Sequence, residues 1–259
     1  SICQNNKIPL IVDNTAAPYI CKPLQHGANI VVYSTTKYIG GHGLSIGGLI
    51  IDGGTFDWEK AGDKFPMMNR PDPSYHGAIW SQAAKPLGPI AYILRARVIL
   101  LRDLGSAMSP FNAFTFIQGL ETLPLRMERH CTNAKQVANF LNKHDKIDKV
   151  IYPSLMNGVH GDRAKKYLQG GFGSLLGFEL KEGESAGKKF IDNLKLLYHV
   201  ANIGDARSLA IHPASTTHSQ LSPEEQLSSG VTPGYVRLSI GIEHIDDIIQ
   251  DLDQALSKT

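Results

Sequence analysis

Two short apolar runs near the start of the sequence predict a pair of neighbouring β-strands. Residues 8–12 are apolar and lead into Asp13, and residues 31–33 are apolar and lead into a run of hydroxyl residues. Continuous apolar runs are typical of strands in a parallel sheet that helices cover on both faces. Residues 21–27 suit a short helix that ends near Gly27, so this part of the chain is expected to form a strand–helix–strand unit.

The rest of the sequence alternates between strand and helix patterns. A strand is expected over residues 46–52, and apolar residues at helical spacing predict a helix over residues 89–104. The elements expected beyond residue 145 are strand 149–153, strand 174–180, helix 185–200, a helix that starts at Ser222-Pro223, strand 235–240 and a last helix with apolar residues from Ile245 to Leu252. This alternation predicts an α/β protein.

A long helical region begins after Ser109-Pro110 and contains Pro124, which is expected to bend or interrupt it. Such a helix commonly joins two domains. We therefore place a domain boundary near residue 122, which gives domains of residues 1–122 and 123–259.

Residues 53–88 are rich in Gly, Pro, Met and aromatic residues and show no sustained period. A long irregular segment inside a compact domain is usually functional or mobile. We expect a loop over the mouth of an active site, and the alternative is simple surface packing.

Composition narrows the classes of function. The 259 residues carry a formal net charge of +2 and no dense run of Lys or Arg, so the sequence offers no electrostatic case for binding nucleic acid. No apolar stretch approaches the roughly 20 residues of a membrane span. The three cysteines are odd in number and widely spaced, which favours a reducing compartment such as the cytoplasm over a disulfide framework or a zinc site.

Polar residues at the ends of two predicted strands carry the candidate chemistry. Asp13 follows the first strand, and Lys37 follows the second, after Ser34 and Thr36. Ligands gather outside the carboxyl ends of strands in such sheets. A carboxylate, an amine and hydroxyls suit a ligand with a protonatable ring nitrogen, a carbonyl carbon and a phosphate. Pyridoxal 5′-phosphate (PLP) is such a ligand, since it requires a Schiff-base lysine and an acid that pairs with its pyridinium nitrogen.

These residues also have purely structural interpretations. Lys37 could be a solvated lysine in a turn, and Asp13 could cap the end of a strand. Arg237 lies in the middle of a predicted strand, where an unpaired guanidinium is costly. It either forms a salt bridge or binds a substrate carboxylate through two hydrogen bonds. No metal site is expected, because the scattered histidines lack matched ligands; they are His42, His212 and His218.

Four blocks occur in a characteristic order. They are Val12-Asp13-Asn14-Thr15, Ser34-Thr35-Thr36-Lys37-Tyr38-Ile39-Gly40-Gly41-His42, His212-Pro213-Ala214-Ser215-Thr216-Thr217-His218 and Val236-Arg237-Leu238-Ser239-Ile240-Gly241-Ile242-Glu243. Together they resemble the Cys/Met-metabolism branch of fold-type I PLP-dependent enzymes, which includes cystathionine γ-synthase, the γ-lyases and the sulfhydrylases. Residues 42–48 and 202–209 look most like the O-acetylhomoserine sulfhydrylase branch.

The resemblance implies PLP as the cofactor and gives roles to seven residues. Lys37 is expected to hold the cofactor as a Schiff-base lysine and to act as a general base. Asp13 is expected to keep the ring nitrogen protonated. The other expected site residues are Asn14, Ser34 and Thr36 for the cofactor and its phosphate, and Arg237 and Asn202 for the α-carboxylate of the substrate.

The resemblance also implies a fold and a reaction. The fold is aspartate-aminotransferase-like, with part of the large mixed or parallel-sheet domain in residues 1–122 and a smaller C-terminal α/β domain in residues 123–259. The reaction is γ-replacement, in which O-acetyl-L-homoserine and sulfide or a small thiol give homocysteine or methionine and acetate. A γ-lyase of the same family and a non-catalytic fragment unable to hold PLP alone are the alternatives.

Family members carry a long segment ahead of the aspartate strand. The chain is therefore expected to be the C-terminal part of a longer polypeptide. With that segment it is expected to form a homo-oligomer, a dimer of dimers, in the cytoplasm.

Overall fold

The computed structural model describes residues 2–259, which fall into two compact units. Unit 1 contains the residues up to Thr15, Lys22–Thr35 and Ile46–Thr115. Unit 2 contains Ala16–Cys21, Thr36–Ser45 and Phe116–Thr259. The segment that carries Lys37 thus belongs to unit 2, although it directly follows a strand of unit 1. These units are not a test of the domain boundary near residue 122, which stays a prediction.

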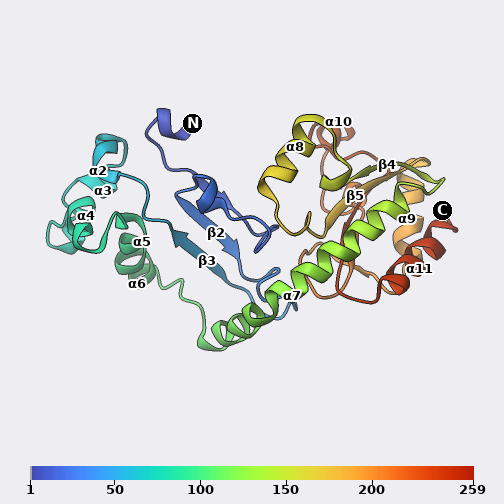
Figure 1. The fold of residues 1–259 in the computed structure, drawn as a ribbon, viewed down its shortest axis with the longest axis horizontal. Helices are drawn as coiled ribbons and strands as arrows, with labels where there is room; N and C mark the ends of the chain where they lie inside the picture. Colours follow the sequence, from blue (N-terminus) through green and yellow to red (C-terminus); the bar gives the residue numbers. More distant parts are fainter. Residues whose placement is uncertain (1) are drawn as a thin grey trace. The chain divides into compact units, whose positions relative to one another are not determined.

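Unit 1 is built on a three-stranded sheet in the order β1-β2-β3, in which β2 and β3 lie side by side (Figure 1). Its strands are β1 (Ile11–Asp13), β2 (Ile30–Ser34) and β3 (Gly48–Asp52). β1 and β2 are parallel, with Asp13 opposite Val32, and β3 runs antiparallel to β2. The predicted strand–helix–strand unit is confirmed, and its helix is the 3₁₀ turn η1 (Pro23–His26), which ends at Gly27 with φ of 92°.

Short helices account for most of residues 53–88, so the expectation of an irregular loop was wrong. They are α2 (Trp58–Ala61), η2 (Gly62–Lys64), α3 (Pro66–Asn69), η3 (Pro73–Tyr75), α4 (Trp80–Ala83) and η4 (Lys85–Leu87). None is longer than four residues, which is too short for a helical period to show in the sequence. Their Trp58, Met68 and Trp80 side chains are buried in one apolar cluster with Ile30 of β2, so the segment contributes to the core of unit 1. Its expected place over an active site stays a prediction.

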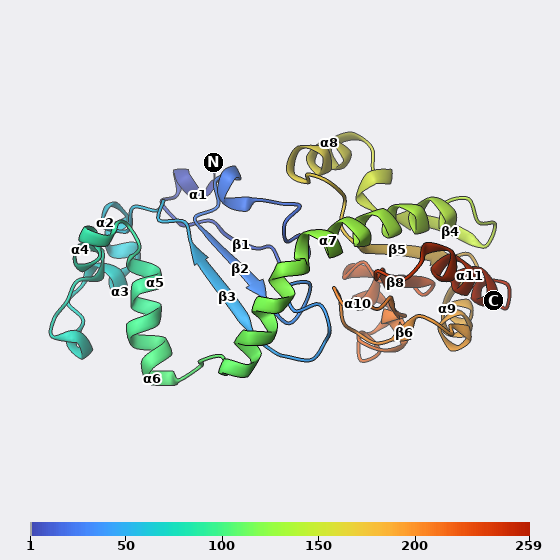
Figure 2. The same cartoon turned by 60° about the horizontal axis from the view of Figure 1, so that its bottom comes forward.

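A helical stretch over α5 (Ala91–Arg95), the π-helical turn η5 (Ala96–Leu101) and α6 (Arg102–Leu104) confirms the helix predicted at residues 89–104. α5 contacts β3 (Figure 2). The first helix of the chain is α1 (Ile2–Asn5).

The long helix α7 (Pro110–Leu141) continues through Pro124 without interruption, contrary to one of the two expectations for this proline. Most helical stability in proteins comes from packing of a buried face. Leu123 and Met127, on either side of the proline, are both buried and supply that packing. Within residues 2–259, no helix, α7 included, is apolar enough over a sufficient length to cross a lipid bilayer.

Unit 2 contains a five-stranded sheet in the order β4-β5-β8-β7-β6. The strands are β4 (Ile147–Ile151), β5 (Leu175–Leu180), β6 (Tyr198–His199), β7 (Leu209–Ile211) and β8 (Tyr235–Ser239). All neighbours are antiparallel except β6 and β7. Arg237 lies in the centre of this sheet, opposite Gly177 on one side and Ile211 on the other.

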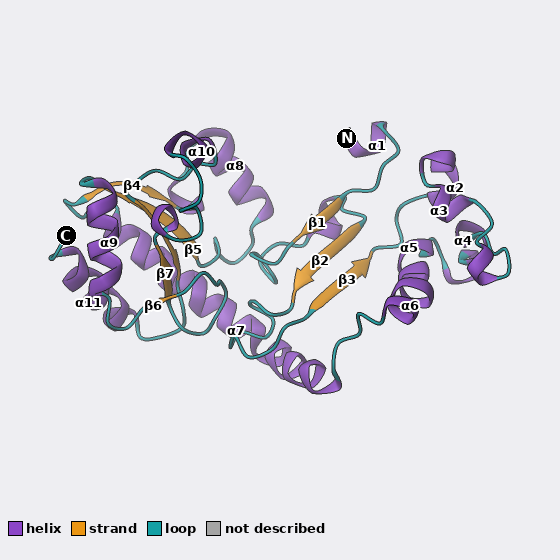
Figure 3. Cartoon of the chain, turned by 180° about the vertical axis from the view of Figure 1, so that it is seen from behind, coloured by secondary structure: helices purple, strands orange, loops and turns teal. Residues whose placement is uncertain are grey.

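The helices of unit 2, besides α7, are α8 (Gly158–Tyr167), α9 (Gly183–Asn193), α10 (Pro223–Ser228) and α11 (Ile245–Leu256). The predicted start of α10 is confirmed by a capping box between Ser222 and Glu225. α9 and α11 lie side by side, and both contribute to the core with α7 and the sheet (Figure 3).

The helix predicted over residues 185–200 ends earlier, at Asn193. The buried carboxylate of Asp251 on α11 accepts hydrogen bonds from the backbone N–H groups of the next residues. These are Lys195, Leu196 and Leu197, at 2.8, 2.8 and 3.0 Å. Because these N–H groups point to α11, they cannot donate to helical carbonyls, and the chain leaves the helix to form β6.

Candidate active site

The segment Thr36–Ser45, which we call the lysine segment, follows β2 and forms a turn in unit 2. The N–H of Gly41 donates to the carbonyl of Lys37 at 2.7 Å. The next residue, Tyr38, is completely buried, and its hydroxyl lies 2.5 Å from Oγ of Ser174. Burial raises the pKa of Tyr38 to about 12, so its hydroxyl stays neutral. The residue beside the lysine is thus anchored in the core.

The side chain of Lys37 contacts a second predicted residue. Its Nζ donates a hydrogen bond to Oδ1 of Asn202. The backbone carbonyl of Asn202 in turn accepts a hydrogen bond from Nη2 of Arg237 at 3.3 Å. The structure therefore brings Lys37, Asn202 and Arg237 together in unit 2. No ion pair joins Arg237 to a carboxylate in the described part of the chain, which disfavours the salt-bridge interpretation.

The loop that carries Asn202 has little freedom. Gly204 has φ of 72°, and its N–H donates to Oγ of Ser239 at 3.0 Å. A Cβ at this glycine would lie 2.6 Å from the ring of Tyr38. The same loop is thus fixed to β8 and packs directly on the residue after Lys37.

The remaining predicted residues, apart from Thr36 in unit 2, lie at the carboxyl edge of the β1–β2 pair in unit 1. Asp13 is exposed there, and its Oδ1 accepts a hydrogen bond from the N–H of Thr15 at 2.9 Å. Asn14 is buried and donates from Nδ2 to the Tyr33 hydroxyl at 3.0 Å. The N–H of Ser34, the last residue of β2, donates to Oγ1 of Thr15 at 2.8 Å. The end of β1 is therefore cross-linked to the end of β2.

The chemistry of these groups fits PLP. Asp13 offers an exposed carboxylate for a ring nitrogen, and Ser34 and Thr36 offer hydroxyls for a phosphate. Lys37 offers a primary amine whose hydrogen-bond acceptor is a neutral amide. An amine bound to an amide is easier to release to a carbonyl carbon than one held by a carboxylate.

The three histidines that were considered for a metal site, His42, His212 and His218, have hydrogen-bond partners within the protein. Nδ1 of His212 lies 2.8 Å from Oγ of Ser215, and Nε2 lies 2.8 Å from the carbonyl of Pro233. His42 and His218 each contact a near neighbour in sequence through Nδ1. Among residues 2–259, no group of three or more His, Cys, Asp or Glu side chains is placed to hold a metal ion.

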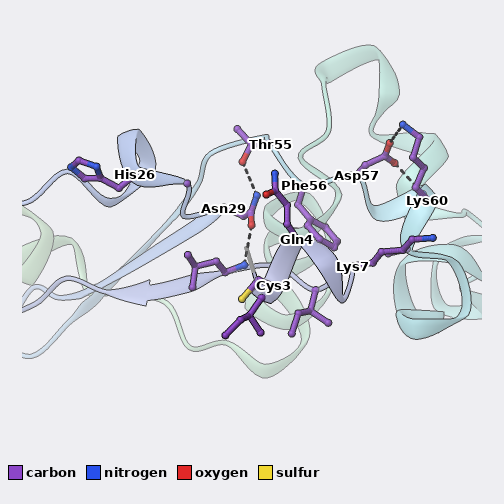
Figure 4. A pocket seen from close by; sticks show the side chains of 14 residues that line it. Cys3, Gln4, Lys7, His26, Asn29, Thr55, Phe56, Asp57 and Lys60 are labelled. Carbon is purple, nitrogen blue, oxygen red and sulfur yellow. Dashed lines mark hydrogen bonds and ion pairs between the residues drawn. The ribbon is translucent and has the colours of Figure 1, made fainter. Parts of the chain in front are cut away.

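A cavity of about 700 Å³ in unit 1 contains none of the predicted site residues. Figure 4 shows two pairs of polar side chains in contact at this cavity, Asn29 with Thr55 and Asp57 with Lys60. Asn29 accepts from the N–H of Leu10 and donates to Thr55, each at 2.9 Å, and Lys60 pairs with Asp57 at 3.1 Å. The cavity is lined by Ile2, Cys3, Gln4, Lys7, Ile8, Leu10, His26, Gly27, Asn29, Thr55, Phe56, Asp57, Lys60 and Ala61. It offers no competing catalytic constellation.

Sequence reasoning missed one group beside the lysine segment. Arg126, in the middle of α7, contacts the backbone of the two residues after Lys37. The sequence marks it only by its place three residues after the apolar Leu123, on the same face of a predicted helix, and charged residues are common in helices.

Comparisons with known proteins show the family of the chain. Residues 1–257 match the family described as Cys/Met metabolism PLP-dependent enzyme. The chain is 59% identical over 256 residues to the O-acetyl-L-homoserine sulfhydrylase of Leptospira meyeri, covering 96% of this chain and 58% of that protein. It is 49% identical over 251 residues to the homocysteine synthase of Schizosaccharomyces pombe, covering 96% of this chain and 58% of that protein.

A solved structure from Campylobacter jejuni, described as an O-acetylhomoserine (thiol)-lyase with N′-pyridoxyl-lysine-5′-monophosphate, is also similar. It aligns with a TM-score of 0.90 at 42% identity and covers 99% of this chain and 60% of that one. The predicted fold class, fold-type I α/β, is thereby confirmed. The chain spans about three fifths of the length of the proteins it matches.

Proposed function

Because this chain belongs to the Cys/Met metabolism PLP-dependent enzymes, we propose that the full-length protein catalyses a γ-replacement. Its substrates are O-acetyl-L-homoserine and sulfide or a small thiol, and its products are homocysteine or methionine and acetate. The observation that carries the proposal is the hydrogen bond from Lys37 to Asn202, whose backbone is bound by Arg237. The names of the L. meyeri and S. pombe relatives support the choice of substrates.

PLP, when bound, supplies a carbonyl carbon that reacts with amines and a protonated ring that accepts electron density. Lys37 would hold the cofactor through Nζ. Asp13 would keep the ring nitrogen protonated through its carboxylate, with Asn14 beside it. Ser34 and Thr36 would donate hydroxyl hydrogen bonds to the phosphate.

The substrate-side residues have separate tasks. Arg237 would bind the α-carboxylate, because a guanidinium can donate two parallel hydrogen bonds to it. Asn202 would orient the carboxylate with Arg237. Lys37, once its amine is free, would take the proton from Cα of the substrate and move a proton at Cβ, which allows acetate to leave from Cγ.

We also propose that the protein is a cytoplasmic homo-oligomer, a dimer of dimers. Each subunit would contain this chain together with the additional polypeptide that its longer relatives have. In that assembly, residues 1–122 would belong to the large cofactor-binding domain and residues 123–259 to the small domain. Light scattering of the purified full-length protein tests the assembly, and a monomeric mass would contradict it.

Product analysis tests the reaction. The full-length protein, loaded with PLP, is supplied with O-acetyl-L-homoserine in the presence and absence of sulfide. Homocysteine and acetate that form only with sulfide are the expected result. An α-keto acid and ammonia formed without sulfide would identify a γ-lyase instead, and the absence of any product would favour a non-catalytic protein.

A further inference from the structure

Arg126 is a buried charge that has no carboxylate partner among the described residues. Only 6% of its surface is exposed. Burial lowers the pKa of its guanidinium, although an arginine stays charged at neutral pH. Burying an ion without an opposite charge is costly unless other groups replace its hydration. The groups that replace the hydration of the Arg126 guanidinium therefore show which parts of the protein it joins.

Three backbone carbonyls and one hydroxyl oxygen, from two parts of unit 2, supply these contacts. Nη1 donates to the carbonyl of Tyr38 at 2.6 Å, and Nη2 donates to the carbonyl of Ile39 at 3.1 Å. Nη2 also donates to the carbonyl of Gly119 on α7 at 2.7 Å, and Nε donates to Oγ1 of Thr122 at 3.1 Å. One planar guanidinium thus connects α7 to the two residues that directly follow Lys37.

Two glycines allow this close approach. A Cβ at Gly119 would lie 2.2 Å from the carbonyl oxygen of Ile39, so α7 and the lysine segment meet backbone to backbone. Gly41 has φ of 74°, and a Cβ there would lie 2.4 Å from Nη1 of Arg126. The guanidinium thereby explains the second glycine after the lysine, Gly41, as a position that has no room for a side chain.

We propose that Arg126 is a positioning residue for Lys37. It fixes the backbone of the lysine turn to the rigid helix α7, while Asn202 binds the amine at the other end of the side chain. Together the two contacts determine where Nζ lies. The inference rests on the role given to Lys37 in the proposed function, but it concerns a different property, the rigidity of the turn.

The test uses the full-length protein with graded substitutions. Arg126→Met removes every donor, and Arg126→Lys keeps the charge but loses the planar set of donors. Thr122→Val removes the acceptor of Nε and the bond of the same hydroxyl to the carbonyl of Gly119 at 3.4 Å, but it keeps the three bonds from the guanidinium to backbone carbonyls, so it is a mild variant in case Arg126→Met fails to fold. Arg129→Met is the matched control, since Arg129 is an exposed arginine on the same helix.

Three properties of each variant are measured. Hydrogen exchange of the peptide that contains residues 38–41 is followed in protein without PLP, together with the unfolding temperature. The values of kcat and KM are then measured with PLP bound and are normalised to the folded fraction.

We expect exchange at residues 38–41 to be about tenfold faster in Arg126→Met, because charged hydrogen bonds to the turn are lost. We expect kcat to fall on the order of 10²-fold with a smaller change in KM, since a shift of about 1 Å in a catalytic group has that effect. Arg126→Lys and Thr122→Val should lie between this variant and Arg129→Met, which should match the wild type.

Wild-type exchange at residues 38–41 in Arg126→Lys and Thr122→Val would overturn the inference. A loss of activity that only follows the unfolded fraction would overturn it as well, because Arg126 would then serve stability alone. Failure of the proposed function is distinguishable. In that case the wild type itself has no activity, while the exchange measured without PLP still reports whether Arg126 holds the turn.

Discussion

Lys37 donates a hydrogen bond from its amine to Oδ1 of Asn202, a residue that lies 165 positions further along the chain. The backbone carbonyl of Asn202 is bound by Arg237 at 3.3 Å. The predicted base and the predicted carboxylate-binding residue are therefore linked through one asparagine. A change at any of the three residues should therefore alter the positions of the other two side chains.

Asn202→Asp should reduce kcat by roughly 10- to 100-fold. The new carboxylate would form a charge-assisted hydrogen bond with Lys37, and such bonds are about twice as strong as neutral ones. The amine would be held in its charged form and could not accept a proton. Steady-state kinetics of the full-length protein would show the effect, with Asn142→Asp, an exposed asparagine in unit 2, as control. Equal kinetics of the two variants would exclude this role for Asn202.

Arg237→Met should raise KM for the amino-acid substrate by roughly 10- to 100-fold, the equivalent of a charged hydrogen bond of about 1.5–3 kcal/mol. Arg237→Lys should recover only part of the loss, because lysine cannot donate the same pair of parallel hydrogen bonds. KM for the sulfur donor should change little. Arg163→Met, at an exposed position on α8, is the control. If KM for both substrates rose equally, Arg237 would not be specific for the α-carboxylate.

His130 should make unit 2 less stable in mild acid. Burial, with a smaller contribution from the charge of Arg126, lowers its pKa to about 4, although the bond from its Nδ1 to the carbonyl of Ile240 at 2.6 Å opposes the shift. Because the pKa is depressed in the folded state, the unfolded state takes up a proton first as the pH falls below about 6.5. Stability from this group is thus complete above pH 6.5 and is lost as the pH falls toward 4.

The expected loss between pH 7 and pH 5 is about 2 kcal/mol. His130→Gln should remove that part of the pH dependence, and His160→Gln, at an exposed position, should leave it unchanged. Denaturant unfolding at the two pH values measures the difference. An identical pH dependence in the wild type and in His130→Gln would contradict the assignment.

Gly204→Ala should destabilise the protein more than Gly230→Ala. Both glycines have positive φ, at 72° and 82°, so both substitutions carry a backbone cost of about 1–2 kcal/mol. A Cβ at Gly204 would also lie 2.6 Å from the Tyr38 ring, whereas a Cβ at Gly230 would meet nothing within 4 Å. The additional cost from overpacking is about 1–3 kcal/mol. Thermal or denaturant unfolding measures the difference, and equal values would show that the contact with Tyr38 is not rigid.

Local sequence patterns correctly predicted the elements that depend mainly on residues close together in the sequence. The apolar runs that end at Asp13 and Ser34 gave the parallel pair β1 and β2, and Ser222-Pro223 gave the start of α10. Long-range contacts decided the failures. Asp251 ends α9 by binding backbone N–H groups across unit 2, and packing of the buried face keeps α7 continuous at Pro124.

The residues of the candidate site also fall into two classes, those that the local sequence marks and those that only long-range contacts reveal. Lys37 and Arg237 stand out because their residue types conflict with the apolar strands around them. Arg126 does not stand out, because a charged residue in a helix is ordinary until its burial is known. Its four contacts join residues that lie up to 88 positions apart, and no local pattern encodes them.

The most direct test of the central claim is to locate the lysine that binds PLP. The full-length protein is loaded with PLP, reduced with borohydride, digested and analysed by peptide mass mapping. A pyridoxyl group is expected on the peptide that contains Lys37, and it should be absent in Lys37→Ala. A pyridoxyl group on another lysine, such as Lys7 or Lys60 at the cavity of unit 1, or no modification at all, would contradict it.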